Sequence, residues 1–274
     1  MDVQDFCLYL QPMKVSDVIS AIEAVAPLYL QDDFDNSGLQ AGFPGADVSR
    51  VLTCLDVTEA VVDEASERSC DMIVSHHPLL FHPLRQVSCA TYQQRCVVKA
   101  ITRGIAVYSA HTSLDNAPGG VNYRIASLMG VGGLQWLRPR PDGAGGSGVT
   151  GTLATPLPDT EFLRSLKAAF GVECLRHTAP CGRMVRSVAI CGGAGAFLAR
   201  DAREKGADAF VTGEIHYHDY FESEGMLLAE LGHYQSEQCT AGLLHDIISS
   251  ALPGLEVLTS SINTNATRYD SFQI

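Results

Sequence analysis

Short apolar runs alternate with amphipathic stretches along this chain, and the first clear unit lies between residues 51 and 75. Val51–Val57 is apolar enough for a buried strand, and Asp71–Ser75 is a second short run of strand type. Between them, Thr58 can cap a helix over Glu59–Arg68. The pattern predicts a strand–helix–strand unit, the building block of a parallel or mixed α/β sheet.

The same alternation continues to the C-terminus. Helical spacing of apolar residues, with matching start and stop signals, predicts further helices over residues 15–28, 92–103, 120–129, 159–170, 194–205 and 232–250. Further strands are expected over residues 105–109, 149–154, 185–191, 208–212, 227–231 and 255–259. Phe34–Gly42 is turn-rich and is expected to be a loop, either a plain connection or one that lines a pocket. Arg138–Gly148 has no apolar periodicity and is expected to be a flexible loop or an edge between subdomains.

The pattern that begins at Val51 recurs from Val188 without a gap. Such an internal echo indicates two related α/β halves. We therefore expect an α/β fold of two related subdomains with mixed sheets that face a shared cleft, residues 1–130 with 232–274 forming one and residues 131–231 the other. The matched pairs are Cys54 with Cys191, Ala65 with Ala202, Asp71 with Asp208, Ser75 with Thr212, and His77 with Glu214.

Polar clusters follow three of the predicted strands. His76 and His77 come directly after Asp71–Ser75, and Pro78 restricts the residue before it, so that the two imidazoles can turn toward one pocket. A second echo places a histidine four residues before a carboxylate in the other two clusters, His111 before Asp115 and His233 before Glu237. Each cluster alone is more often a structural or surface feature, but polar groups at successive strand ends are typical of an α/β active site.

The residue types in these clusters favour a metal site. Imidazole and carboxylate without thiolate suit Zn, Mn, Fe, Ni or Co. A carboxylate can bridge two ions, and a pair of ions can activate a shared hydroxide. If the two halves face each other, one cleft gathers His76, His77, His111, Asp115, Glu214, His233 and Glu237.

Composition limits the partners and the compartment. The chain has 274 residues, 46% of them hydrophobic, and a formal net charge of -12, which argues against nonspecific binding to nucleic acid or to anionic membranes. The chain has nine cysteines, an odd number, and no two of them are spaced as Cys-x-x-Cys, so we expect reduced and mostly buried thiols. With no secretory signal and no apolar run long enough to cross a bilayer, a soluble cytoplasmic protein is expected.

Five segments in this order resemble the Nif3-like family of dinuclear-metal-centre proteins, whose members are often named GTP cyclohydrolase 1 type 2 homologues. The resemblance covers nearly the whole chain and departs from the family pattern at Phe34, where a tryptophan is expected. The segments are Phe34–Gln40, Ser75–Pro78, His111–Asp115, Thr212–Glu214 and Gly232–Glu237.

The resemblance implies two divalent metal ions per chain, of unknown identity. Glu237 would bridge them, with His77 and Asp115 on one ion and His76 and His233 on the other. It also implies a homohexamer, a toroid built as a trimer of dimers, whose metal sites face the interior.

The leading functional hypothesis is a metal-dependent hydrolase that acts on a nucleotide or related small molecule. Glu214 and His111 are the candidates to move protons, although either could instead orient a metal ligand. The chain has no Gly-x-x-x-x-Gly-Lys-[Ser/Thr] phosphate loop. Two alternatives stay open, a metal-dependent phosphoesterase and a metal-bound oligomeric scaffold without turnover.

Overall fold

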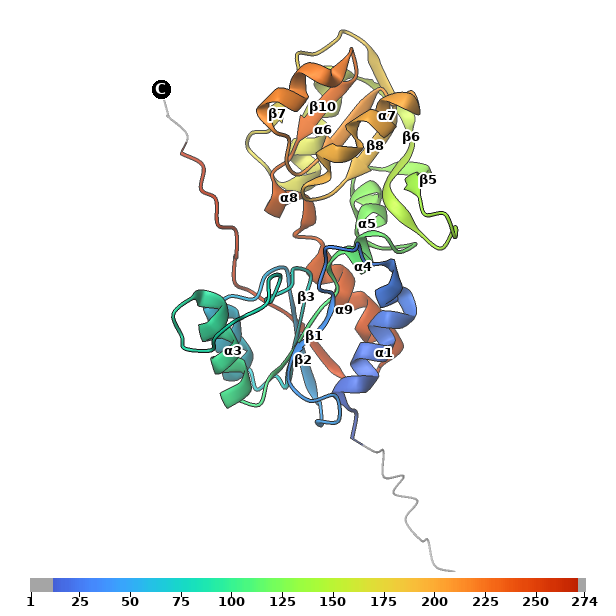
Figure 1. Cartoon of the computed structure of the whole chain (residues 1–274). Coiled ribbons are helices and arrows are strands. Elements are labelled where there is room, and N and C mark those ends of the chain that lie inside the picture. Colours follow the sequence, from blue (N-terminus) through green and yellow to red (C-terminus); the bar gives the residue numbers. More distant parts are fainter. Residues whose placement is uncertain (1–11, 271–274) are drawn as a thin grey trace, which may run out of the picture.

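Two β-sheets, each flanked by helices, form the two lobes of the molecule (Figure 1), a computed structural model that describes residues 12–270. The first sheet has the strand order β1-β4-β3-β2-β11, in which only β1 runs antiparallel to its neighbour. Its strands are β1 (Gly38–Ala41), β2 (Arg50–Cys54), β3 (Met72–Ser75), β4 (Ala106–Ser109) and β11 (Glu256–Thr259).

The second sheet has the order β5-β6-β8-β9-β10-β7. Its centre, β8-β9-β10, is parallel, and the strands outside it are antiparallel to their neighbours, so both sheets are mixed as predicted. The strands are β5 (Val131–Pro139), β6 (Gly146–Pro158), β7 (Arg176–His177), β8 (Met184–Cys191), β9 (Ala209–Thr212) and β10 (Leu227–Glu230).

Helices cover both faces of the first sheet: α1 and α9 pack together on one face, and α2 and α3 pack together on the other (Figure 1). Thr58 caps α2 as predicted, since its side chain accepts a hydrogen bond from the N–H of Val61. None of the helices between residues 12 and 270 is both long and apolar enough to cross a bilayer. The helices are α1 (Val15–Val25), α2 (Glu59–Glu67), α3 (Tyr92–Thr102), α4 (His111–Asp115), α5 (Val121–Leu128), α6 (Asp159–Phe170), α7 (Ala199–Glu204), α8 (His233–Glu237) and α9 (Thr240–Ala251), with 3-10 turns η1 (Leu28–Leu30), η2 (Gly195–Leu198) and η3 (Tyr217–Ser223).

The internal echo corresponds to a repeated piece of structure. In the parallel pair β2-β3, Cys54 lies opposite Ser75, and in the parallel pair β8-β9, Cys191 lies opposite Thr212. The aspartate that directly precedes the second strand of each pair, Asp71 before β3 and Asp208 before β9, also makes the same kind of hydrogen bond in both halves.

The carboxylate of Asp71 accepts the backbone N–H of Arg50, and that of Asp208 accepts the N–H of Ser187. The two halves are therefore related in the register that the sequence predicts. The division into residues 1–130 with 232–274 and residues 131–231 stays a prediction.

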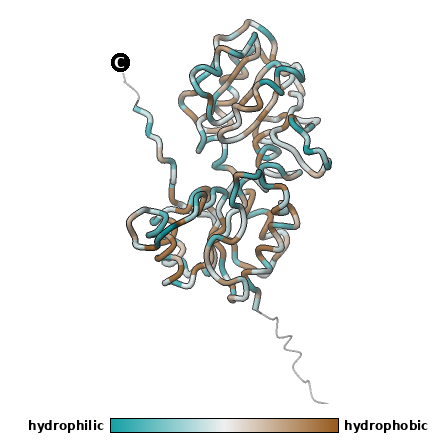
Figure 2. Tube along the Cα trace, viewed as in Figure 1, coloured by the Kyte–Doolittle hydropathy of each residue, from teal (hydrophilic) through white to brown (hydrophobic). Residues whose placement is uncertain are grey.

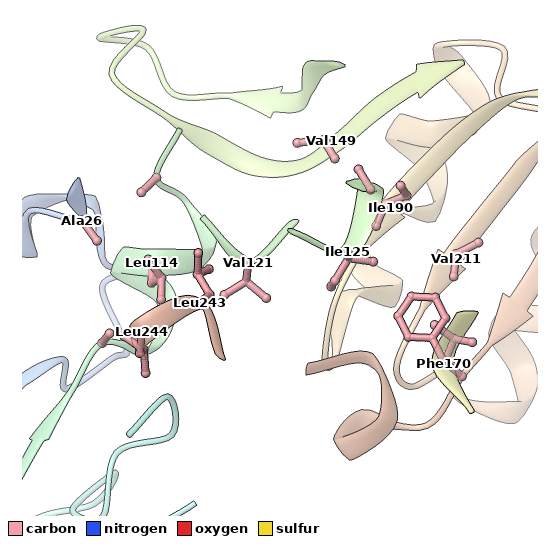
Figure 3. Close-up of a cluster of buried hydrophobic side chains, with 14 of the residues drawn as sticks. Ala26, Leu114, Val121, Ile125, Val149, Phe170, Ile190, Val211, Leu243 and Leu244 are labelled. Carbon is pink, nitrogen blue, oxygen red and sulfur yellow. The ribbon is translucent and has the colours of Figure 1, made fainter. Parts of the chain in front are cut away.

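The largest apolar core runs through both lobes. Figure 3 shows its buried side chains extending from Ala26 and Leu244 through Ile125 to Val211 and Phe170. Figure 2 shows the hydrophobic stretches along the strands and helices inside each lobe. Because α5 and α9 contribute to this core, the ends of the strands beside them are held in fixed positions.

The stretch Arg138–Gly148, expected as a flexible loop or an edge, is a β-hairpin. Its two ends belong to β5 and β6, and only residues 140–145 connect them. A side chain on Gly146 would lie 2.6 Å from the carbonyl oxygen of Arg138 and 2.9 Å from the ring of Trp136. Glycine is present there because the paired strand is close, a reason that composition alone does not reveal.

Other predicted boundaries also needed correction. The helix expected over 232–250 is broken into α8 and α9, and the one expected over 194–205 begins as η2. Pro156 and Pro158, expected after the strand, lie within β6, where its pairing with β8 shifts register and a missing N–H is tolerated. The turn-rich segment Phe34–Gly42 ends in β1.

The cysteines are less buried than predicted. Cys7 lies outside the described residues, and the other eight form no disulfide. Four of these are buried, namely Cys54, Cys70, Cys96 and Cys191, while Cys89, Cys174 and Cys181 are exposed.

Glu64 on α2 anchors the segment that follows β11. Its carboxylate accepts hydrogen bonds from Ser260 and Ser261 and pairs with Arg68 at 3.0 Å. Burial raises the pKa of Glu64, but these hydrogen bonds outweigh burial and lower it below its usual value.

We expect Glu64→Gln to lower the free energy of unfolding by about 1–2 kcal/mol at pH 7, because charge-assisted hydrogen bonds are lost. A depressed folded-state pKa contributes stability that is present above the unfolded pKa and lost as the pH falls through the folded value. The difference between the two proteins should therefore shrink below about pH 4.3. Urea unfolding at pH 7 and pH 3.5 checks this, and an unchanged difference at the lower pH contradicts it.

Candidate metal centre

His76 and His77 continue the line of β3 beyond its end. Their backbone N–H groups donate to the carbonyls of Cys54 and Leu55, at 3.2 and 3.0 Å. In a regular strand the two side chains would point to opposite faces. Instead their ring centroids lie 4.8 Å apart, so the two imidazoles lie close together, and His77 lines the cavity described below.

The helix α4 supplies the second cluster, directly after β4. Asp115 lies at its end, with Oδ1 3.7 Å from Nε2 of His76. His111 begins the helix in a left-handed conformation, with φ of 27°. This unusual backbone turns the imidazole toward the cluster, where its centroid lies 5.5 Å from that of His76 and 5.6 Å from that of His77.

The helix α8 supplies the third cluster, directly after β10. His233 and Glu237 lie one turn apart, with Nε2 3.1 Å from Oε2. The same carboxylate reaches both adjacent histidines: Oε2 lies 3.0 Å from Nε2 of His77, and Oε1 lies 3.6 Å from Nε2 of His76. One carboxylate therefore faces three imidazoles, the position that a bridging ligand needs.

The surroundings of His76 fit a metal ligand. Its side chain is fully buried, and neither ring nitrogen has a hydrogen-bond partner among residues 12–270. An unpaired buried polar group is costly, and a bound cation removes that cost. The donor atoms of His76, His77 and Glu237 lie within 4.8 Å of one another, so the three can hold one ion or share two.

Burial and charge set the protonation of the cluster. Burial lowers the pKa of His76 to about 4, which keeps its nitrogens available as ligands. Burial also lowers the pKa of His77, but hydrogen bonds to Asp56 and Glu237 outweigh it and raise the value to about 10.

The two carboxylates of the cluster shift in opposite directions. Burial, reinforced by the negative charge of Glu237, raises the pKa of Asp115. Burial opposes ionisation of Glu237 too, but hydrogen bonds with His233 and His77 and the nearby ring of His76 lower its pKa. Glu237 is therefore an anion, and a cation bound here competes with the proton on His77.

Carboxylates outside the cluster orient its imidazoles. Oδ1 of Asp56 lies 2.7 Å from Nδ1 of His77, and Oε1 of Glu214 lies 3.1 Å from Nδ1 of His233. Such contacts fix the tautomer, so that Nε2 of each ring faces Glu237 at the centre of the cluster. Sequence analysis missed Asp56, although it lies only two residues beyond the end of the strand β2.

The two predicted catalytic residues lie in different places. Glu214 is more than half exposed and contacts His233 from behind, on the side away from Glu237. His111 lines the cavity over the cluster, and Asp35 holds its Nδ1 at 2.6 Å. Asp35 was not singled out by the sequence analysis either, which left the loop that carries it as either a plain connection or one that lines a pocket.

Gly193 is another residue that sequence analysis missed. It has φ of 56°, and a Cβ there would lie 2.4 Å from Oε1 of Glu237. Its N–H donates to Oγ of Ser236, which ties this turn to α8. The internal echo offered a signal, since Gly193 and Asp56 occupy equivalent positions after equivalent strands.

The contacts group the side chains differently from the pairing that the resemblance implies. Among the histidines of the cluster, Asp115 lies nearest His76, whereas Nε2 of His77 lies 3.3 Å from Nε2 of His233. The expected pairing had placed His77 with Asp115. The assignment of each ligand to an ion stays a prediction.

We expect Asp56→Asn to weaken metal binding about 10- to 100-fold, because it removes the anion that orients His77. Thr264, which donates to the same carboxylate, can still bond the amide, so the surrounding fold should persist. Titration with a competing chelator measures the change. An affinity equal to that of the unaltered protein would show that Asp56 has no part in holding the ligand.

A cavity of about 460 Å³ opens over the cluster. His77, Asp115, His233 and Glu237 lie along it, together with residues of both lobes. A second cavity, of about 620 Å³, also reaches His77 and His233 and is lined by the segment 264–269.

Two mixed sheets, with a partly buried histidine–carboxylate cluster near the ends of their central strands, define an α/β protein with a candidate metal centre. The family described as Duf34/NIF3 (NGG1p interacting factor 3) matches residues 13–266, and the chain belongs to this family, as its motifs indicate.

Curated relatives and solved structures agree with this assignment. The chain is 34% identical to a GTP cyclohydrolase 1 type 2 homolog from Clostridium perfringens over 82% of this chain and 87% of that one. It is also 34% identical to the protein of the same name from Lactococcus lactis, over 92% and 98%. The crystal structure of a hypothetical protein from Staphylococcus aureus superposes with a TM-score of 0.89 at 26% identity, over 94% of this chain and all of that one.

Proposed function

We propose that the protein is a dinuclear metal-dependent hydrolase that acts on a nucleotide or related small molecule. The observation that supports this most concerns His76, whose two buried ring nitrogens have no hydrogen-bond partner among the described residues. Its ligand atom lies within 4.8 Å of those of His77 and Glu237, so that the three could hold a metal ion. Its relatives named GTP cyclohydrolase 1 type 2 homolog suggest a heterocyclic substrate.

The proposed metal ligands are His76, His77, Asp115, His233 and Glu237, with Glu237 as the bridge. Zn, Fe, Mn, Ni and Co all suit this donor set. Two bound divalent ions would supply an activated water and neutralise charge that develops on the substrate.

The residues of the chain would divide the remaining tasks. His111, on the cavity side and oriented by Asp35, is placed to give or take a proton from a ligand above the cluster. Glu214 contacts only His233 within the cluster, so its proposed part is to position that imidazole. Nε2 of His77 and Nε2 of His233 lie 3.3 Å apart, so both nitrogens are close enough to share one bound ion.

The function is tested with one metal-loaded sample assayed for purine ring opening and for phosphate release. Ring opening that requires metal and is lost in His111→Ala, with metal content unchanged, supports the proposal. Phosphate release alone would indicate a phosphoesterase, and no turnover across the panel would favour a scaffold without catalysis.

We also propose a homohexamer, a trimer of dimers, on the basis of family membership. The expected result is a particle of six chains by light scattering coupled to size-exclusion chromatography. Because exposed aromatic rings such as Tyr217 and Phe221 cost free energy when left in water, burying them in contacts between chains would favour assembly. A monomer at micromolar concentration would contradict this prediction.

A further inference from the structure

Aromatic side chains surround the mouth of the cavity over the cluster. Phe34 comes from the loop before β1, Phe81 from the loop after β3, and Phe197 from η2 of the other lobe. They are 66%, 39% and 56% exposed, although each lines the same cavity. Large apolar rings gathered at one opening indicate a ligand that covers them.

The rings continue inward to the cluster. The centroids of Phe34 and Phe81 lie 6.4 Å apart, and those of Phe81 and His111 lie 5.9 Å apart. His111 in turn lies 5.6 Å from His77. One wall of the cavity is thus aromatic from its rim to the candidate metal ligands, which suits a flat ligand that stacks.

The charge along the cavity is one-sided. Its lining includes four carboxylates and, among the described residues, no lysine or arginine. Arg138 lies 5.3 Å from the ring of Phe197, but Asp201 holds its guanidinium. Phosphate groups are usually held by such side chains, so no lysine or arginine of the described residues is placed along this cavity to hold them.

Bound metal would not reverse this balance. Six carboxylates line the cavity or contact its histidines, and they outnumber the four positive charges of two divalent ions. The six are Asp32, Asp35, Asp56, Asp115, Glu214 and Glu237.

We propose that this cavity selects a planar aromatic heterocycle without phosphate, of the nucleobase or nucleoside class, and disfavours nucleoside triphosphates. The inference rests on the proposed function, because it takes the same cluster as the reaction site. It narrows the range of substrates from nucleotides and related molecules to heterocycles without phosphate. The stacking surfaces are Phe34, Phe81 and Phe197, and the carboxylates repel a polyanion.

Calorimetry with guanosine and GTP tests the proposal on the full-length protein, with metal and after chelation. Guanosine should bind at least about tenfold more tightly than GTP in both states, because the rings and carboxylates are present in both. Phe34→Ala should weaken guanosine binding about fivefold or more. Phe43→Ala is the matched control, since Phe43 is 77% exposed but lies outside the cavity, and it should change nothing.

Three outcomes would overturn the proposal: GTP binding as tightly as guanosine, no guanosine binding, or an unchanged affinity in Phe34→Ala. If GTP is preferred and the preference disappears in a double Arg176→Ala, Arg268→Ala variant, the phosphates occupy the second cavity, which those arginines line. Metal content measured on the same samples separates the claims. Absent metal contradicts the proposed function, whereas bound metal with a preference for GTP contradicts only the ligand class.

Discussion

Glu237→Gln is expected to leave the purified protein with little or no bound metal. The carboxylate is almost fully buried and faces His76, His77 and His233 at 3.6, 3.0 and 3.1 Å. An amide of the same shape keeps one weak oxygen ligand and cannot bridge two cations. Loss of a group that only orients a metal ligand lowers metal affinity by up to about a hundredfold. Loss of the bridging carboxylate should therefore lower metal affinity by more than that.

Glu230→Gln is the control for this variant. Glu230 is another buried glutamate, at the end of β10, and accepts hydrogen bonds from Ile215 and Tyr220 rather than from the histidines of the cluster. We expect it to retain the metal content of the unaltered protein. Full loading of Glu237→Gln, measured by elemental analysis, would remove Glu237 from the ligand set.

Gly193→Ala is expected to release metal without altering any ligand. The new Cβ would lie 2.4 Å from Oε1 of Glu237 and 3.0 Å from its Cδ, so the carboxylate must move. The backbone also resists, since φ of 56° costs a residue with a side chain about 1 kcal/mol or more. Metal affinity should fall about as far as in Glu237→Gln.

Gly171→Ala separates these two effects. Gly171 ends α6 with φ of 63°, and a Cβ there meets no atom within 4 Å. Both variants share a similar backbone cost, but only Gly193→Ala has the contact with Glu237, so only Gly193→Ala should lose metal. Equal metal content in the two variants would show that the contact with Glu237 is relieved at little cost.

The strands and ligands that sequence analysis found share a physical signal. The central strands β2, β3 and β9, and the second half of β8, are short and mostly apolar runs that are buried at nearly every position, because both of their faces are covered. Their ends meet at the same edge of a sheet, so polar residues that follow them in sequence become neighbours in space. This explains why Asp115, expected near His76, lies 3.7 Å from it.

The missed elements lack that signal. The edge strand β5 is half exposed and contains Gly132 and Gly133, and β7 has only two residues, so neither has an apolar run that marks a strand. Their formation depends on partners elsewhere in the chain, which local propensity does not encode.

The supporting residues of the site were missed for a related reason. Asp56 and Asp35 act through contacts with His77 and His111, which lie 21 and 76 residues away in sequence. Gly193 matters only because Glu237 packs against it. Roles of this kind depend on tertiary distance, whereas a ligand motif is recognised by residue type and spacing.

Metal content of the unaltered protein tests the central claim most directly. The protein is purified without added chelator, equilibrated with each candidate divalent ion, desalted, and analysed for metal per chain. Two tightly held ions per chain are expected. No retained metal with any of Zn, Fe, Mn, Ni or Co would contradict the claim that His76, His77, Asp115, His233 and Glu237 form a dinuclear centre.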